Sequence, residues 1–279
     1  MANNEGPIRL TPSMIPNSPN FDVRDSSFFR KWDELPSPKD VQAQAEAQRL
    51  AGFNPNPRRD YQSAVPYFIK PQPAVFEDLN LLVKWGRTEN ISEAQALFAL
   101  RRLLNGLVPY IRGQTLEQAW DKLEPEDKVS IFHELRTICD NLRRLEQDPS
   151  DPFVVKGPFA TVKEFHDWFT FLCRRRMPDP YSVLIEPYRY ELPDDCAIKF
   201  THGDLHRSNI VISSSRPYRT LAIVDWEQSG WFPAYWEARK AQYTAWMTEE
   251  WTTTYLPIIL DMYADTLESW DYYTISIGP

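Results

Sequence analysis

Three cysteines and nine glycines are few for a chain of 279 residues, and several patterns that define large protein classes are missing. Cys139, Cys173 and Cys196 are odd in number and form no CxxC pair, which argues against a disulfide framework and a zinc site. No apolar run approaches the roughly 20 residues of a membrane-spanning helix, which argues against a membrane partner. The N-terminal segment MANNEGPIRL lacks the apolar core of a signal peptide, so we expect a cytoplasmic protein.

Positive charge is also in short supply, because 31 Lys and Arg face 39 Asp and Glu and leave a net charge of −8. This balance argues against nucleic acid as the main partner, since its phosphates attract basic surfaces. It is compatible with a cationic small molecule, although ordinary cytosolic proteins are acidic too. Hydrophobic residues make up 42% of the chain, enough for a sizeable core. The composition does not indicate the oligomeric state.

The most informative stretch is THGDLHRSNIVISSSRPYRTLAIVDWE, at residues 201–227. Residues 209–212 and 221–225 each contain an apolar, β-branched run, and residues 213–217 between them are typical of a turn. We therefore predict a β-hairpin, in which the start of the first strand lies about 5 Å from the end of the second.

This hairpin should bring together Asn209 and Asp225, and Asp204 lies on the loop just before it. Carboxylate and amide oxygens are hard ligands of the kind that Mg²⁺ prefers. The sequence therefore predicts a magnesium site shared with a phosphate chain.

The pattern H-G-D-x-x-x-x-N, followed by an apolar strand that ends in Asp, resembles the phosphotransfer core of protein-kinase-like enzymes. The segments HGDLHRSN, DWE and EQSGWFPAYWE are similar to the aminoglycoside phosphotransferase and choline kinase-like family, and within it to a fungal-type group. Many relatives carry Pro-Gly where this chain has Arg207-Ser208. The resemblance implies a phosphotransferase that uses ATP and Mg²⁺ and acts on a hydroxyl of a small molecule.

The resemblance also implies a role for each polar residue of this stretch. Asp204 would orient the acceptor hydroxyl or accept its proton, and His202 would brace the catalytic loop. Asn209 and Asp225 would hold the metal. Glu227 would lie near that metal or near the acceptor.

A second pair of residues lies upstream, where residues 74–86 predict one or two strands. Lys84 ends an apolar strand, and Glu93 lies in the first turn of a helix predicted over ISEAQALFALRRLL. The pair resembles the lysine and glutamate that hold the phosphates of ATP. The alternative is a solvated lysine and a glutamate favoured by the helix dipole alone. No GxGxxG precedes Lys84, but the family does not require that motif.

The strands and hinge that bind adenine in the family have no counterpart after this helix. The chain runs from Leu107-Val108-Pro109 directly into residues 110–116, which resemble the segment after the hinge, and a smaller gap falls near residues 155–156. Two strands need about ten residues. The alternative function is therefore a pseudokinase or binding module that lacks the hinge. The gap has two alternative origins, a degenerate paralogue or a misjoined gene model.

We predict an α+β, protein-kinase-like fold of two lobes. A Pro-rich N-terminal extension over residues 1–73 would hold one short helix, opened by Ser37 and ended by Gly52, and its first twenty residues would be disordered. Residues 74–113 would form an incomplete N-lobe, and residues 114–279 a mainly helical C-lobe with the catalytic loop and the hairpin. Apolar periodicity predicts further helices in the C-lobe over residues 125–146, 162–173 and 234–247.

Two features have competing interpretations. The segment GDLH also resembles the GDxH motif of metallophosphoesterases, but such a site needs further histidine ligands, and the remaining His133 and His166 fall inside helical patterns. A group of aromatic residues just after Asp225 is either a wall that holds an ammonium group by cation–π contact, or ordinary core, which we favour. This group comprises Trp226, Trp231, Phe232, Tyr235 and Trp236.

Overall fold

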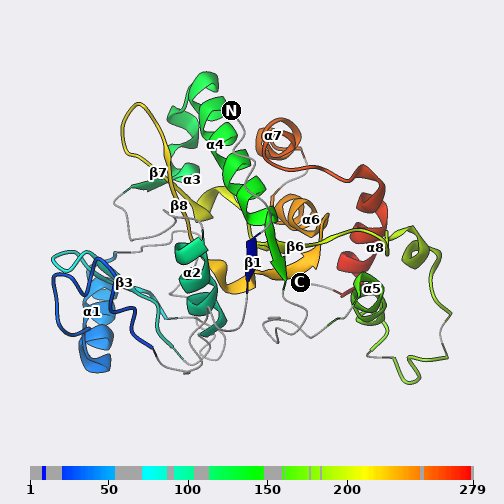
Figure 1. The fold of residues 1–279 in the computed structure, drawn as a ribbon, viewed down its shortest axis with the longest axis horizontal. Coiled ribbons are helices and arrows are strands. Elements are labelled where there is room, and N and C mark those ends of the chain that lie inside the picture. Colours follow the sequence, from blue (N-terminus) through cyan, green and yellow to red (C-terminus); the bar gives the residue numbers. More distant parts are fainter. Residues whose placement is uncertain are drawn as a thin grey trace.

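Helices and small sheets alternate along the chain, which confirms the predicted α+β class (Figure 1). The computed structural model describes residues 8–10, 21–53, 71–86, 91–103, 113–147, 159, 161–175, 177–182, 184–245 and 248–277. The α-helices are α1 (Pro38–Leu50), α2 (Ile91–Leu103), α3 (Leu116–Ala119), α4 (Pro125–Arg143), α5 (Val162–Phe171), α6 (Trp236–Tyr243), α7 (Leu256–Ile259) and α8 (Leu267–Ile277). The strands are β1 (Ile8–Leu10), β2 (Ala74–Phe76), β3 (Leu81–Val83), β4 (Gln114–Thr115), β5 (Leu145–Gln147), β6 (Ile198–Thr201), β7 (Ile210–Ile212), β8 (Thr220–Ile223) and β9 (Gly230–Pro233).

Several predictions fall on residues outside these ranges. The gap after Pro109 and the smaller gap near residues 155–156 both do, and so does most of the proline-rich linker over residues 54–73. The predicted disorder of the first twenty residues is wrong for Ile8–Leu10, which form β1 and pair in parallel with β5.

The predicted hairpin is confirmed, because β7 and β8 pair antiparallel with Ile210 opposite Ile223. The Val224 N–H donates to the Asn209 carbonyl at 2.8 Å, which extends the pairing to the residue before Asp225. Strand β4 pairs with the other edge of β7, so the hairpin is anchored in a three-stranded sheet. Strand β6 precedes the hairpin in sequence and β9 follows it, and these two strands form a separate antiparallel pair.

Helix α1 begins at the predicted cap and lies against β2 (Figure 1). The Ser37 side chain accepts from the Asp40 N–H, and the Asp40 carboxylate accepts from the Ser37 N–H, which forms a capping box. On the buried face, Gln48 Nε2 donates to the Pro73 carbonyl at 3.0 Å, and Gln48 Oε1 accepts from the Val75 N–H at 2.6 Å. The Gln48 side chain thus makes hydrogen bonds to the backbone at the edge of β2 of the kind that a neighbouring strand would make.

The main hydrophobic core lies along α4, where Ile131, Phe132 and Leu135 are completely buried. This helix ends at Arg143 rather than at residue 146, because the next residues extend into β5 and pair with β1. Helix α6 begins at Trp236, two residues later than predicted, because a turn at residues 234–235 separates it from β9 (Gly230–Pro233).

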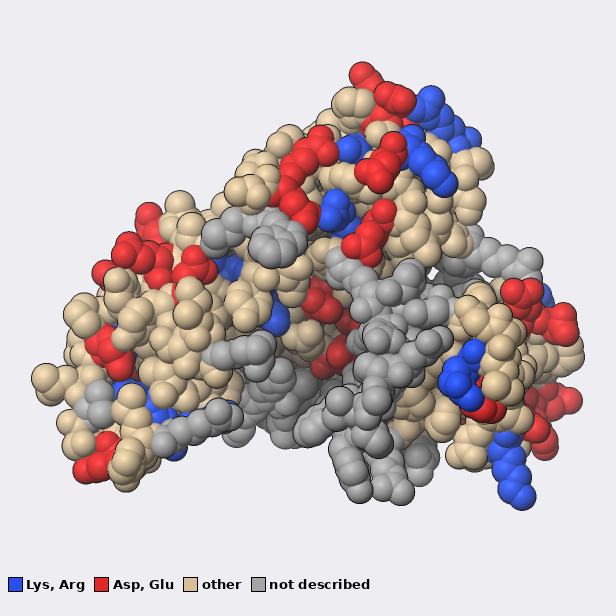
Figure 2. All heavy atoms as spheres, turned by 180° about the vertical axis from the view of Figure 1, so that it is seen from behind, with Lys and Arg blue, Asp and Glu red and all other residues tan. Residues whose placement is uncertain are grey.

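The aromatic residues after Asp225 are core, as favoured, and not an open wall. Trp226 and Trp231 are buried in the main core, whereas Phe232 and Tyr235 are buried in a second cluster with Trp270. Within the described ranges, no helix combines the length and apolar character that crossing a membrane requires. On the face shown in Figure 2, the described basic side chains are interspersed with acidic ones.

Candidate functional site

The loop of residues 202–209, called the catalytic loop below, joins β6 to β7 and is held by its own side chains. Asn209 Nδ2 donates to the Asp204 carbonyl at 2.9 Å and to Asp204 Oδ2 at 3.0 Å. This contact fixes the direction of the Asp204 carboxylate. The other atom of the amide, Asn209 Oδ1, accepts a long 3.3 Å hydrogen bond from the Ser208 hydroxyl. That oxygen is of the type that binds Mg²⁺.

His202 lies at the start of this loop and is almost completely buried. Its Nδ1 accepts from the Asp204 N–H at 3.2 Å, so its Nε2 carries the proton that is donated to the Val224 carbonyl at 3.0 Å. The imidazole therefore connects the catalytic loop to the end of β8, next to Asp225. This arrangement fits the bracing role implied by the resemblance.

Glu237, on α6, binds the start of the catalytic loop. Its role was not predicted from the sequence. Its carboxylate accepts from the His202 N–H at 2.5 Å and from the Gly203 N–H at 3.1 Å. Burial raises the pKa of Glu237, while His202 and the two N–H donors act in the opposite direction. A glutamate in the first turn of a helix is expected from the helix dipole alone, so the sequence carried no clear signal for this contact.

Lys84, directly after β3, reaches two carboxylates that come from distant parts of the chain. Its Nζ lies 2.7 Å from Glu93 Oε1, on α2, and 2.7 Å from Asp225 Oδ1, after β8. The predicted pairing of Lys84 with Glu93 is thus confirmed as a contact, and the lysine also meets the predicted metal ligand. Burial lowers the pKa of Lys84, but the two carboxylates outweigh it and the net pKa is raised.

Glu93 also binds the loop that carries Asp225, because Glu93 Oε1 accepts from the Trp226 N–H at 3.2 Å. Asp225 itself has a left-handed backbone, with φ of +68° and ψ of +61°. Such a conformation is uncommon outside glycine, is tolerated best by Asn and Asp, and concentrates at functional sites.

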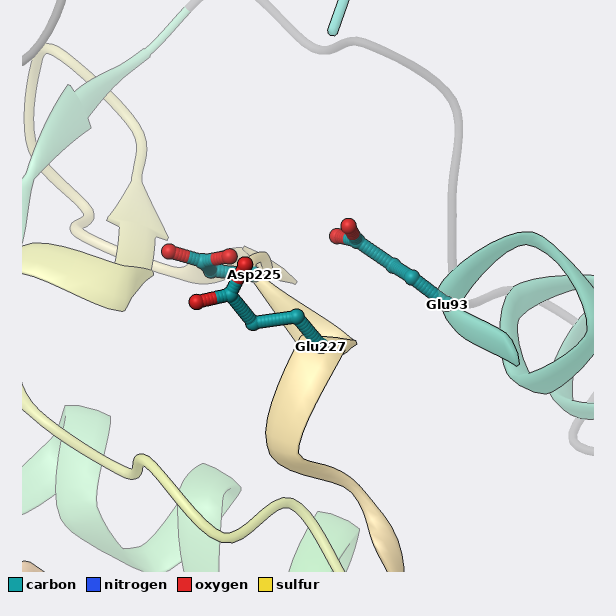
Figure 3. Close-up of side chains that lie close together, drawn as sticks. All are labelled: Glu93, Asp225 and Glu227. Atoms are coloured by element: carbon teal, nitrogen blue, oxygen red, sulfur yellow. The ribbon is translucent and has the colours of Figure 1, made fainter. Parts of the chain in front are cut away.

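Three carboxylates converge at this point, as Figure 3 shows for Glu93, Asp225 and Glu227. One oxygen of each lies within 4.8 Å of the others. The structure therefore joins two predicted metal ligands, Asp225 and Glu227, with a residue that was predicted to bind the nucleotide. It places the third predicted ligand, Asn209, beside Asp225 through the backbone of Val224, while the Asn209 amide nitrogen is directed to Asp204.

The structure thus shows a lysine–glutamate contact, a cluster of three carboxylates and an aspartate whose carboxylate is directed by an asparagine. A family model for the phosphotransferase enzyme family (APH) matches residues 96–273, which is more than half of the chain. The protein belongs to this family, which implies a protein-kinase-like fold. No curated protein matches the chain. The matched region begins after Lys84 and Glu93, so their position beside Asp225 is a finding of the structure alone.

Proposed function

We propose that the protein transfers the γ-phosphoryl group of ATP to a hydroxyl of a small molecule, with Mg²⁺ as its cofactor. The observation that carries the proposal is the double contact of Lys84 with Glu93 and Asp225. This contact joins Lys84 and Glu93, which are expected to hold the phosphates, to Asp225, which is expected to hold the metal. Kinase-like sites need both the phosphate-binding pair and the metal ligand.

The proposal includes two lobes, with residues 74–113 as a shortened small lobe and 114–279 as the large one, preceded by the extension over residues 1–73. The rival hypothesis, a binding module without activity, depends on a missing hinge, and residues 104–112 lie outside the described ranges. The net charge of −8 is compatible with a cationic acceptor.

Asp225, Glu227 and Asn209 would hold the metal. Their oxygens form a donor set that suits Mg²⁺, and Asp225 Oδ1 already accepts a hydrogen bond from the Lys84 ammonium group at 2.7 Å. When bound, Mg²⁺ neutralises charge on the β- and γ-phosphates.

Asp204 would act on the acceptor. Its carboxylate, directed by Asn209, would take the hydroxyl proton while the hydroxyl oxygen bonds to the γ-phosphorus. The bond from that phosphorus to the bridging oxygen breaks, and ADP leaves with the electron pair. Lys84 would hold the phosphates in place throughout.

The test compares variants of two carboxylates of the site, Asp225 and Asp204. The thermal unfolding of each variant is measured with and without Mg-ATP. At a hundred times its Kd, the ligand should add about 2.7 kcal/mol, a shift on the order of 5 °C. Asp225→Asn should abolish the shift because it removes the negative charge of the main metal ligand. Asp204→Asn should keep it and lower phosphoryl transfer by about 10²–10⁴-fold, because only proton transfer is lost.

Transfer is followed as ADP formation with a panel of hydroxyl compounds. The proposal is wrong if the folded wild-type protein shows no shift, or if Asp225→Asn shifts as far as the wild type does.

A further inference from the structure

Arg207 lies near the end of the catalytic loop, and its side chain is hydrogen-bonded to Glu249, which lies 42 positions further along the chain. Its Nη2 donates to Glu249 Oε2 at 2.6 Å, and its guanidinium lies 4.6 Å from the centre of the Trp120 ring. The Arg207 side chain is only 14% exposed, and that of Glu249 is 31% exposed. A charged hydrogen bond shielded in this way is stronger than an ion pair on an open surface.

The next residue, Glu250, makes a parallel contact that does not involve the catalytic loop. Lys128 Nζ, on α4, donates to Glu250 Oε2 at 2.9 Å and lies 4.3 Å from the centre of the same Trp120 ring. Two consecutive carboxylates therefore hold two cations that share one aromatic ring. Only the first of these ion pairs includes a residue of the loop.

The contact of Arg207 differs in position from the other contacts that hold this loop. Glu237 binds the start of the loop, through the backbone of His202 and Gly203. Arg207 instead belongs to the short 3₁₀ turn Arg207–Asn209, directly before β7. A movement of this turn would move Asn209, whose amide directs the Asp204 carboxylate.

We propose that Glu249 is a positioning residue, which acts through Arg207 to hold the catalytic loop in the geometry that aims Asp204 at the acceptor. The inference rests on the proposed function for the role of Asp204, but the link between Glu249 and the loop stands on its own contacts. Its test therefore needs one measurement on the loop and one on the reaction.

The experiment compares Glu249→Gln with the matched control Glu250→Gln, which removes an equal charge from the neighbouring ion pair. Hydrogen exchange of the backbone amides of residues 203–209 is measured first, in the full chain and without ligand. Exchange should become faster in Glu249→Gln and stay at the wild-type rate in Glu250→Gln, because Lys128 lies outside the loop. A thermal melt verifies that both variants fold.

Turnover of Mg-ATP is then measured for both variants. Glu249→Gln should lower kcat by about ten- to a hundredfold, the penalty for misplacing a reacting group by up to about 1 Å, while KM for ATP stays unchanged. Arg207→Lys, which keeps a cation opposite Glu249, should lower kcat less than Glu249→Gln does.

Equal exchange in the two variants, or equal turnover in an active protein, would overturn the inference, since both ion pairs would then only support the fold. If the wild-type protein neither binds nor turns over Mg-ATP, the proposed function fails. In that case the exchange comparison by itself decides the inference. Faster exchange in Glu249→Gln, but not in Glu250→Gln, would support the role of Glu249 in holding the loop.

Discussion

Gly203 shows how one position in the catalytic loop constrains the site. Its φ is +77°, and a Cβ built there would lie 2.4 Å from the Gln228 carbonyl oxygen. Both the backbone angle and the lack of space therefore require glycine. Gln228 is the last residue of the short 3₁₀ turn that also contains Glu227, so the close approach keeps the catalytic loop near the three carboxylates.

Replacing Gly203 with Ala should lower the free energy of unfolding by more than about 3 kcal/mol, because strain and overlap add. Gly52→Ala is the matched control, since Gly52 has a similar φ of +73° but nothing within 4 Å of the added Cβ. It should cost only the strain of the left-handed backbone, about 1–2 kcal/mol. Urea denaturation measures both, and equal losses would show that the contact with Gln228 has no effect.

At the scale of the elements, helix α1 has a role that the sequence did not predict, which is to support the strands before Lys84. It comes from the extension, yet Val41 and Ala45 pack against Ala74 of β2 in a small hydrophobic cluster. Gln44 adds a 2.7 Å bond from its Nε2 to the Val75 carbonyl, beside the two bonds of Gln48. Helix α1 therefore stabilises the strands that lead to Lys84.

Gln48→Ala should lower the free energy of unfolding by about 2–3 kcal/mol, because it leaves the buried Val75 N–H without its acceptor. Gln42→Ala, on the exposed face of the same helix, should change it by less than about 0.5 kcal/mol. Chemical denaturation of the two variants tests the comparison. Equal effects would mean that the helix only covers the sheet and that its glutamine bonds contribute nothing.

The packing of the second core cluster buries a titratable network between α5 and α6. His166 is completely buried, with Nδ1 2.7 Å from Asp194 Oδ1 and Nε2 2.7 Å from the Tyr235 hydroxyl. Burial lowers the pKa of His166, which Asp194 partly offsets and Arg189 reinforces. This network makes stability depend on pH.

Because the folded-state pKa of His166 lies below the unfolded value of about 6.5, its contribution to stability is present above pH ~6.5. It is lost as the pH falls through the folded pKa, with a slope of up to about 1.4 kcal/mol per pH unit. Asp167 and Asp194 have lowered pKa values too, so their contributions are lost only below pH ~3.9.

The measurement is the free energy of unfolding between pH 7.5 and 5 for the wild type and for His166→Gln. The wild type should lose stability below pH ~6.5, and the variant should be flatter over that window. Subtracting the two curves removes the opposite effect of Glu237, whose raised pKa favours the protonated, low-pH form. Parallel curves would show that His166 does not titrate differently in the folded protein.

Much of the local structure followed from the order of residues. The hairpin, the helix after Lys84 and the cap at Ser37 were predicted and found, because turn residues, β-branched runs and capping groups act on neighbours a few positions away. The residues of the candidate site were predicted from type and spacing together with the resemblance to a known family. Their catalytic roles remain proposals.

The contacts between distant segments were decided only by the packed chain. Lys84 meets Asp225 across 141 positions, Glu237 holds the turn at His202, and β1 pairs with β5. Such contacts depend on the path that the chain takes around its core, and composition and spacing say little about that path. The sequence therefore determined which chemical groups are available, and the tertiary structure decided which of them share one charged site.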